Sequence, residues 1–153
     1  MFKKLFASVA LVAALSSGAF AGDGVLDVVA PFEIKGADPS LSGHIFMKMD
    51  IAETLVDADT IGRLHAGLAT SWSASDDGLT WRFELRQGVT FHDGSPLTAE
   101  AAAQALTFAH GKAGLLAKAP ITAISADGNA VVFSLSAPFA ALPAFLAEYP
   151  FHV

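Results

Sequence analysis

Few side chains in this sequence of 153 residues have the types and spacing that chemistry requires. The five histidines stand singly, without metal-ligand spacing, and the absence of cysteine excludes Cys-ligated zinc and iron–sulfur sites. Asp76 and Asp77 are adjacent, as paired acid catalysts could be, but the glycine after them is typical of a hairpin turn. Glycine-rich nucleotide loops, serine elbows and HExxH motifs do not occur. We therefore predict no catalytic site and no bound cofactor, so the chain is not expected to be an enzyme.

Two groups of side chains could instead bind a ligand. Trp72 and Trp81 could form a stacking platform, although Trp81 alternates with charged residues, which is typical of the buried face of a strand. Met47 and Met49 could offer a soft surface to a metal, and their setting on an apolar helix equally indicates a place in the core. The residue types alone leave both alternatives open.

The first element that must position these side chains is an apolar helical stripe. Ile45, Met49, Ala52 and Val56 recur at helical spacing and predict a helix over 45–56. A polar connection over 57–66 should follow it. Before the helix, Asp38, Pro39 and Ser40 have turn chemistry, and the β-branched run Val25–Ala30 predicts a short strand.

Two hairpins are predicted further along the chain. In the first, over 69–92, the turn at 76–78 is followed by an alternation of apolar and charged residues, with Trp81, Phe83 and Leu85 on the apolar side. Val89 and Phe91 should resume this strand after Gly88. In the second hairpin, strands over 121–126 and 130–135 flank an Asp-Gly-Asn turn.

Two more helices complete the expected fold, which belongs to the mixed α/β class. Thr98 is a suitable N-cap for a helix that runs to about His110, and Gly111 can close its C-terminus. A last helix should present one apolar face, with Pro143 tolerated in its first turn; that face consists of Phe139, Leu142, Leu146 and Tyr149.

Composition and charge narrow the function classes. The chain is 53% hydrophobic, which is too apolar for a disordered protein. It carries 9 basic against 15 acidic residues, a formal net charge of −6, so it lacks the basic surface that a nucleic-acid partner needs. We expect one domain that binds no nucleic acid.

Residues 1–21 have the pattern of a cleavable secretory signal peptide. Lys3 and Lys4 form a positive start, an apolar run extends over 5–15, and Ala19-Phe20-Ala21 is a small-residue cleavage site. A membrane anchor is the alternative, but the run is shorter than the roughly 20 residues that a spanning helix needs. No cysteine follows the run, so a lipoprotein is excluded. We expect a protein of the periplasm, with stability from packing alone.

The stretch 67–100, GLATSWSASDDGLTWRFELRQGVTFHDGSPLTAE, resembles the signature region of family 5 extracellular solute-binding proteins. These are the peptide- and nickel-binding receptors of ABC importers. The resemblance extends outward to Asp38-Pro39, to the segment 52–56, and to the segment 130–135 with the Pro138-Phe139 pair after it, so it covers nearly all of 25–153.

The resemblance implies a bilobal periplasmic binding protein that delivers a small ligand, an oligopeptide or a nickel chelate, to ABC permease subunits of the inner membrane. Because family members run to several hundred residues, residues 22–153 should be the N-terminal part of the first lobe, with the second lobe absent. Whether such a truncated chain binds ligand alone stays open, since one wall of the cleft is missing. The alternative is a small stand-alone periplasmic interaction domain that reuses the scaffold.

The resemblance also suggests ligand-binding residues. It places Phe46 and Met47 beside the cleft, and it places His152 where the nickel-binding branch has an arginine that holds a carboxylate of the chelate. A neutral histidine does not form the two-pronged contact of an arginine, so an anionic chelate is disfavoured. A core position for Phe46 and a merely terminal position for His152 remain the alternatives.

Overall fold

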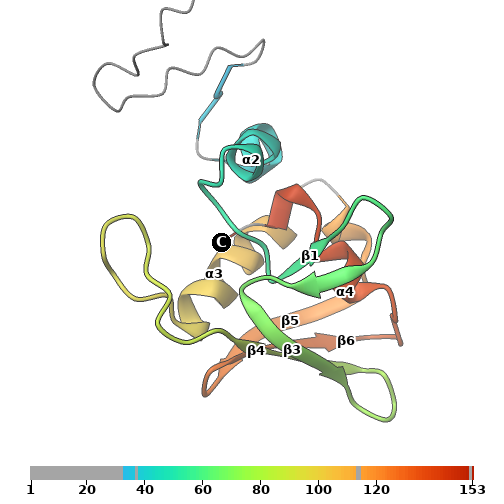
Figure 1. Cartoon of the computed structure of the whole chain (residues 1–153). Helices are drawn as coiled ribbons and strands as arrows, with labels where there is room; N and C mark the ends of the chain where they lie inside the picture. Colours follow the sequence, from blue (N-terminus) through green and yellow to red (C-terminus); the bar gives the residue numbers. More distant parts are fainter. Residues whose placement is uncertain (1–32, 37, 113–114, 152) are drawn as a thin grey trace, which may run out of the picture. The chain divides into compact units, whose positions relative to one another are not determined.

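The computed structural model describes residues 33–36, 38–112, 115–151 and 153, all within one unit of the chain, Glu33–Val153. It combines antiparallel sheets with helices, which confirms the predicted mixed α/β class (Figure 1). The predicted signal peptide and the predicted strand Val25–Ala30 lie outside the described residues. Within the described ranges, no helix has the length and apolar character needed to span a membrane.

The main sheet is built from the two predicted hairpins. One consists of β3 (Ala69–Ala74) and β4 (Thr80–Leu85), the other of β5 (Ile121–Asp127) and β6 (Ala130–Leu135). Antiparallel pairing of β4 with β6 joins them in the order β3-β4-β6-β5. The predicted resumption of the strand after β4 is not formed, because beyond Gly88 the chain makes a single isolated pairing, Thr90 with Pro96.

Aromatic side chains from β3, β4 and β6 pack against one another. Phe83 is fully buried and meets Phe133 edge to face, with ring centroids 5.4 Å apart. The rings of Trp72 and Trp81 stack against Phe83 at centroid distances of 6.3 and 6.2 Å. Trp81 therefore packs against the core, as interpreted, and is itself only partly buried.

The long helix α3 (Ala99–His110) covers this sheet with a face of small residues. Its buried positions are Ala99, Ala102, Ala103, Leu106 and Ala109, which lets the helix approach β5 closely. Thr98 is the predicted N-cap, because its hydroxyl accepts a hydrogen bond from the backbone N–H of Ala101 at 3.1 Å. A single 3-10 turn, η1 (Leu116–Lys118), follows the helix.

The first helix differs from its prediction. The helix α2 (Pro39–Lys48) begins at the predicted turn and ends well before Val56. The apolar spacing continues beyond Lys48, but Asp50 has a left-handed backbone, φ 52°, which terminates a right-handed helix. The prediction of a polar connection over 57–66 is also wrong, because β1 (Val56–Ala58) and β2 (Leu64–Ala66) pair there as a small antiparallel hairpin.

The predicted last helix is divided in two. α4 (Leu142–Phe145) is a single turn with Pro143 at its start, and η2 (Tyr149–Phe151) is a 3-10 turn. Leu142 and Leu146 are buried as predicted, whereas Tyr149 is 43% exposed. Pro150 lacks the N–H that a continuous helix would need at this point, which accounts for the break.

Candidate functional site

Two of the three predicted ligand-binding residues, Phe46 and Met47, lie on α2, and each is half-buried. Their helix is fixed by Ile45, which is 1% exposed, and by Ser42, whose buried hydroxyl accepts a hydrogen bond from the backbone N–H of Lys35 at 3.0 Å. The helix therefore buries one side and leaves Phe46 and Met47 on its flank, where a ligand could reach them.

The end of α2 creates a hollow beside Met47. After the left-handed turn at Asp50, the backbone N–H of Ile51 bonds back to the carbonyl of Phe46 at 2.9 Å. The chain then runs extended through Glu53 and Thr54 into β1, away from the helix. Side chains of the helix end and of the extended segment consequently face a common space.

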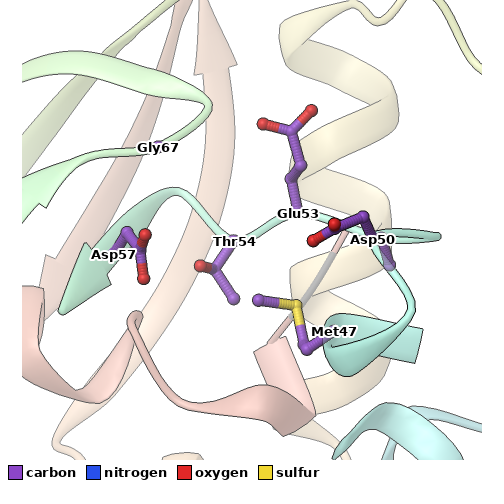
Figure 2. A pocket seen from close by; sticks show the side chains of 7 residues that line it. Met47, Asp50, Glu53, Thr54, Asp57 and Gly67 are labelled. Carbon is purple, nitrogen blue, oxygen red and sulfur yellow. The ribbon is translucent and has the colours of Figure 1, made fainter. Parts of the chain in front are cut away.

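This hollow has a volume of about 370 Å³. Figure 2 shows the thioether of Met47 directed toward Thr54, while Glu53 and Thr54 project to opposite sides of the extended segment. Phe46 is not among the lining residues, so the structure brings only Met47 of the predicted pair into the hollow. Its lining consists of Met47, Asp50, Ala52, Glu53, Thr54, Asp57 and Gly67.

Backbone groups form the floor of the hollow and depend on Gly67. The backbone N–H groups of Leu68 and Ala69 bond to the carbonyls of Thr54 and Leu55, each at 2.9 Å. A Cβ atom on Gly67 would lie 2.5 Å from the carbonyl oxygen of Thr54, so only glycine permits this close approach. The hydroxyl of Thr54, which is 2% exposed, donates to the carbonyl of Val56 at 2.6 Å.

Three carboxylates line the hollow, and they differ in whether a cationic side chain lies beside them. Nη2 of Arg86 reaches both carboxylate oxygens of Glu53, at 3.1 and 2.9 Å, and thereby offsets that charge. Asp57 accepts a hydrogen bond from the backbone N–H of Ala58 at 2.7 Å. Within the described part of the chain, neither Asp50 nor Asp57 has a cationic partner. The lining of the hollow therefore carries a surplus of negative charge, which favours a positively charged group of a ligand.

The carboxylate of Asp59 fixes the hairpin that carries Asp57. Asp59 accepts hydrogen bonds from the backbone N–H and the Nε of Arg63, at 2.9 and 2.7 Å, and from the backbone N–H of Ile61 at 3.0 Å. The backbone and side-chain bonds from Arg63, in that order, are the main causes that lower the pKa of Asp59 to about 2, and His65 adds a smaller contribution. The charged carboxylate thus holds the β1–β2 turn together.

The described residues contain no group of three or more His, Cys, Asp or Glu side chains placed to hold a metal ion. Asp50, Glu53 and Asp57 therefore line a hollow without converging on one point.

A second, smaller hollow of about 140 Å³ lies on the other side of the segment 50–53. It separates this segment from the loop between β4 and α3, residues 86–98, hereafter the β4–α3 loop, which projects from the body of the unit (Figure 1). Nε2 of His92 on this loop lies 2.9 Å from the carbonyl oxygen of Ile51. The backbone N–H of Val153 bonds to the carbonyl of Glu53, also at 2.9 Å.

The third predicted residue, His152, lies outside the described residues. The turn η2, immediately before it in the sequence, packs against α2. There the rings of His44 and Tyr149 meet edge to face, with centroids 5.7 Å apart. The structure therefore brings η2 to the helix that carries Phe46 and Met47.

Asp50, Glu53 and Asp57 are site residues that the sequence reasoning missed. Asp50 and Glu53 fall within the expected helix over 45–56, where they would belong to a solvated polar face, and Asp57 falls in the expected polar connection over 57–66. Because the helix ends at Lys48, they instead surround a hollow. The signal that could have identified the region is Gly67, a glycine two residues before an expected strand.

Comparison with known proteins identifies the family of the chain. Residues 63–153 match the model of the bacterial extracellular solute-binding proteins, family 5 Middle. The chain belongs to this family. The resemblance found in the signature stretch is thereby confirmed, and with it the assignment to a family defined by solute binding rather than catalysis.

Two relatives illustrate the range of the family. The chain is 39% identical over 105 residues to a probable peptide ABC transporter periplasmic-binding protein of Sinorhizobium fredii, a match covering 66% of this chain and 20% of the relative. It is 38% identical over 90 residues to the nickel-binding periplasmic protein of Escherichia coli, covering 52% of this chain and 17% of the relative. The chain thus spans about a fifth or less of the length of these relatives.

Two solved structures share the fold of this chain. NikA of Staphylococcus aureus, in complex with Ni(L-His)2, superposes with a TM-score of 0.72 at 24% identity, covering 80% of this chain and 26% of NikA. The nickel ABC transporter protein of Bacillus halodurans gives a TM-score of 0.68 at 29% identity, covering 76% of this chain and 25% of that protein. The described unit therefore has the fold of one part of a periplasmic binding protein.

Proposed function

We propose that this chain is the N-terminal part of the first lobe of the solute-binding component of an ABC importer for peptides or nickel chelates. The observation that carries the proposal is the family match over residues 63–153, supported by relatives named for peptide and nickel binding. In this role residues 1–21 direct export, the protein works in the periplasm, and its partners are permease subunits of the inner membrane. The relatives lend no support to the alternative of a stand-alone interaction domain.

The hollow beside Met47 is the proposed contact of this lobe with the ligand, and Phe46 and His152 are proposed as further contacts. Asp50 and Asp57 line the hollow without a cationic partner among the described residues. Their charges attract an ammonium group, such as a peptide's amino terminus, and repel an anionic chelate. A polarizable thioether on the same wall suits apolar or metal-bound groups of varied shape. Between the two ligand classes, the charges favour a peptide.

The test is calorimetric titration of the full chain with two probes, tri-alanine and the anionic nickel(II)–EDTA complex. We expect tri-alanine to bind more tightly than the nickel complex, and Met47→Ala to weaken the binding. Met49→Ala is the matched control, because Met49 is two residues away, 46% exposed, and outside the lining of the hollow. Equal effects of the two substitutions would contradict the proposed site. Binding of neither probe to the wild-type chain would contradict the proposal that this hollow holds a ligand without the second lobe.

A further inference from the structure

The segment 50–53 shapes the ligand hollow without belonging to a helix or a strand. Toward α2 it makes two backbone bonds, from Asp50 N–H to the carbonyl of Met47 at 3.3 Å and from Ile51 N–H to that of Phe46 at 2.9 Å. The position of the segment therefore also depends on the hydrogen bonds that its carbonyl groups accept from the rest of the unit. A displacement of Ile51 would be passed through these two bonds to the turn that carries Met47.

The β4–α3 loop beside this segment is internally braced. Leu97 N–H bonds to the carbonyl of Val89 at 2.9 Å, and Phe91 N–H bonds to that of Ser95 at 2.8 Å. The carboxylate of Asp93 accepts from the hydroxyl and the backbone N–H of Ser95, at 2.6 and 2.9 Å. The loop also leads directly into the capped start of α3, so it is a fixed point against which a neighbouring segment can be held.

His92 connects the loop to the segment. Its Nε2 lies 2.9 Å from the carbonyl oxygen of Ile51, and because a carbonyl oxygen only accepts, Nε2 must carry the proton. Glu53, at the far end of the segment, is held separately by Arg86 and by the N–H of Val153. Among the described residues, the His92 bond is the polar link from the loop to the Asp50–Ile51 half of the segment.

We propose that His92 is a positioning residue for the ligand hollow: by donating to the Ile51 carbonyl it sets the placement of Asp50 and, through the helix end, of Met47. His92 does not line the 370 Å³ hollow itself, so it acts through the segment rather than on the ligand. The proposal rests on the proposed function in taking that hollow as the ligand site. Its structural content can be tested without any ligand.

The first arm of the test uses methionine methyl resonances. The chain has three methionines, so carbon-13 labelling of their methyl groups gives few signals, and Met47→Leu identifies the one that matters. We expect H92A to shift or broaden the Met47 signal, and H92Q, whose amide N–H can replace Nε2–H, to restore it. The control H110A changes a histidine at the end of α3, outside both hollows, and should leave the signal in place.

The outcomes separate clearly. An unchanged Met47 signal in H92A, or a shift of equal size in H92Q, overturns the proposal. If H92A loses its circular dichroism, the comparison of H92Q with wild type decides in its place: an unchanged Met47 signal supports the proposal and a shifted one overturns it.

The second arm titrates tri-alanine, and the anionic nickel(II)–EDTA complex, into the same variants. Loss of one hydrogen bond that holds the site should weaken binding about fivefold in H92A, with recovery in H92Q. Unweakened binding in folded H92A overturns the role of His92. If the wild-type chain binds neither probe, the hollow does not hold a ligand in this chain alone, and the methyl resonances still decide whether His92 positions the hollow.

Discussion

Substitution of Gly67 by alanine tests the account of the hollow's floor most directly. The added Cβ would lie 2.5 Å from the carbonyl oxygen of Thr54 and 3.1 Å from that of Leu55. Both oxygens are backbone atoms that already accept hydrogen bonds, from Leu68 and Ala69, so neither can move without stretching a bond. Relief of the overlap must therefore separate the β1 region from the start of β3.

The expected change in the free energy of unfolding is the difference between two opposing effects. Overpacking of this kind costs about 1 to 3 kcal/mol, while the replacement of glycine by alanine restricts the unfolded chain and returns about 0.4 to 1 kcal/mol. We expect G67A to lower the free energy of unfolding by about 1 to 2 kcal/mol. At a urea dependence of about 2 kcal/mol per molar, the midpoint should fall by roughly 0.5 to 1 M.

The assay is urea unfolding followed by circular dichroism, with G111A as the matched control. Gly111 ends α3 with a right-handed backbone, φ −70°, and its added Cβ would meet no atom closer than 3.5 Å. The control should therefore stay within about 0.5 kcal/mol of wild type or gain stability. Equal midpoints for G67A and wild type would refute the close approach at Gly67, and with it the geometry of the hollow.

Two further predictions concern the turn and the helix cap. Because the folded-state pKa of Asp59 lies at about 2, below its ordinary 3.8, its stabilising contribution is complete above about pH 4 and is lost as the pH falls toward 2. Arg63→Ala keeps the backbone N–H, the largest cause, and removes the side-chain bond, so in a carboxyl carbon NMR titration it should move this pKa only part of the way back toward 3.8. An unmoved pKa would contradict the contribution assigned to the Arg63 side chain. Thr98→Ala removes the acceptor of the Ala101 N–H and should lower the free energy of unfolding by about 1 kcal/mol, whereas Thr98→Ser should restore it; urea midpoints decide.

Much of the fold was predictable because its signals are local. The cap at Thr98 lies directly before its helix, and the turns at Gly78 and Gly128 lie between the strands that they join. Both glycines have positive φ, 69° and 60°, which the turns require. Cross-strand pairing then follows from the alternation of apolar and polar residues, since a slip of one residue would turn Phe83 or Phe133 out of the core.

The candidate site was less predictable because it depends on where a helix stops. Apolar spacing continues through Ala52 to Val56, so the periodic signal carries no sign of the left-handed turn at Asp50. The β1–β2 pairing is decided by contacts with Gly67 and Thr54 rather than by strand propensity in the polar residues themselves. Met47 was identified through the family resemblance, and the acidic lining only through the structure.

The stacking of Trp72 and Trp81 on Phe83 has a practical consequence for spectroscopy. These are the only two tryptophans of the chain, and both lie on the β3–β4 hairpin, outside the lining of either hollow beside the segment 50–53. Intrinsic fluorescence therefore reports the assembly of that hairpin and its core. A ligand that enters the Met47 hollow should leave the emission nearly unchanged, so an unchanged fluorescence signal during a titration would be no sign that the hollow is empty.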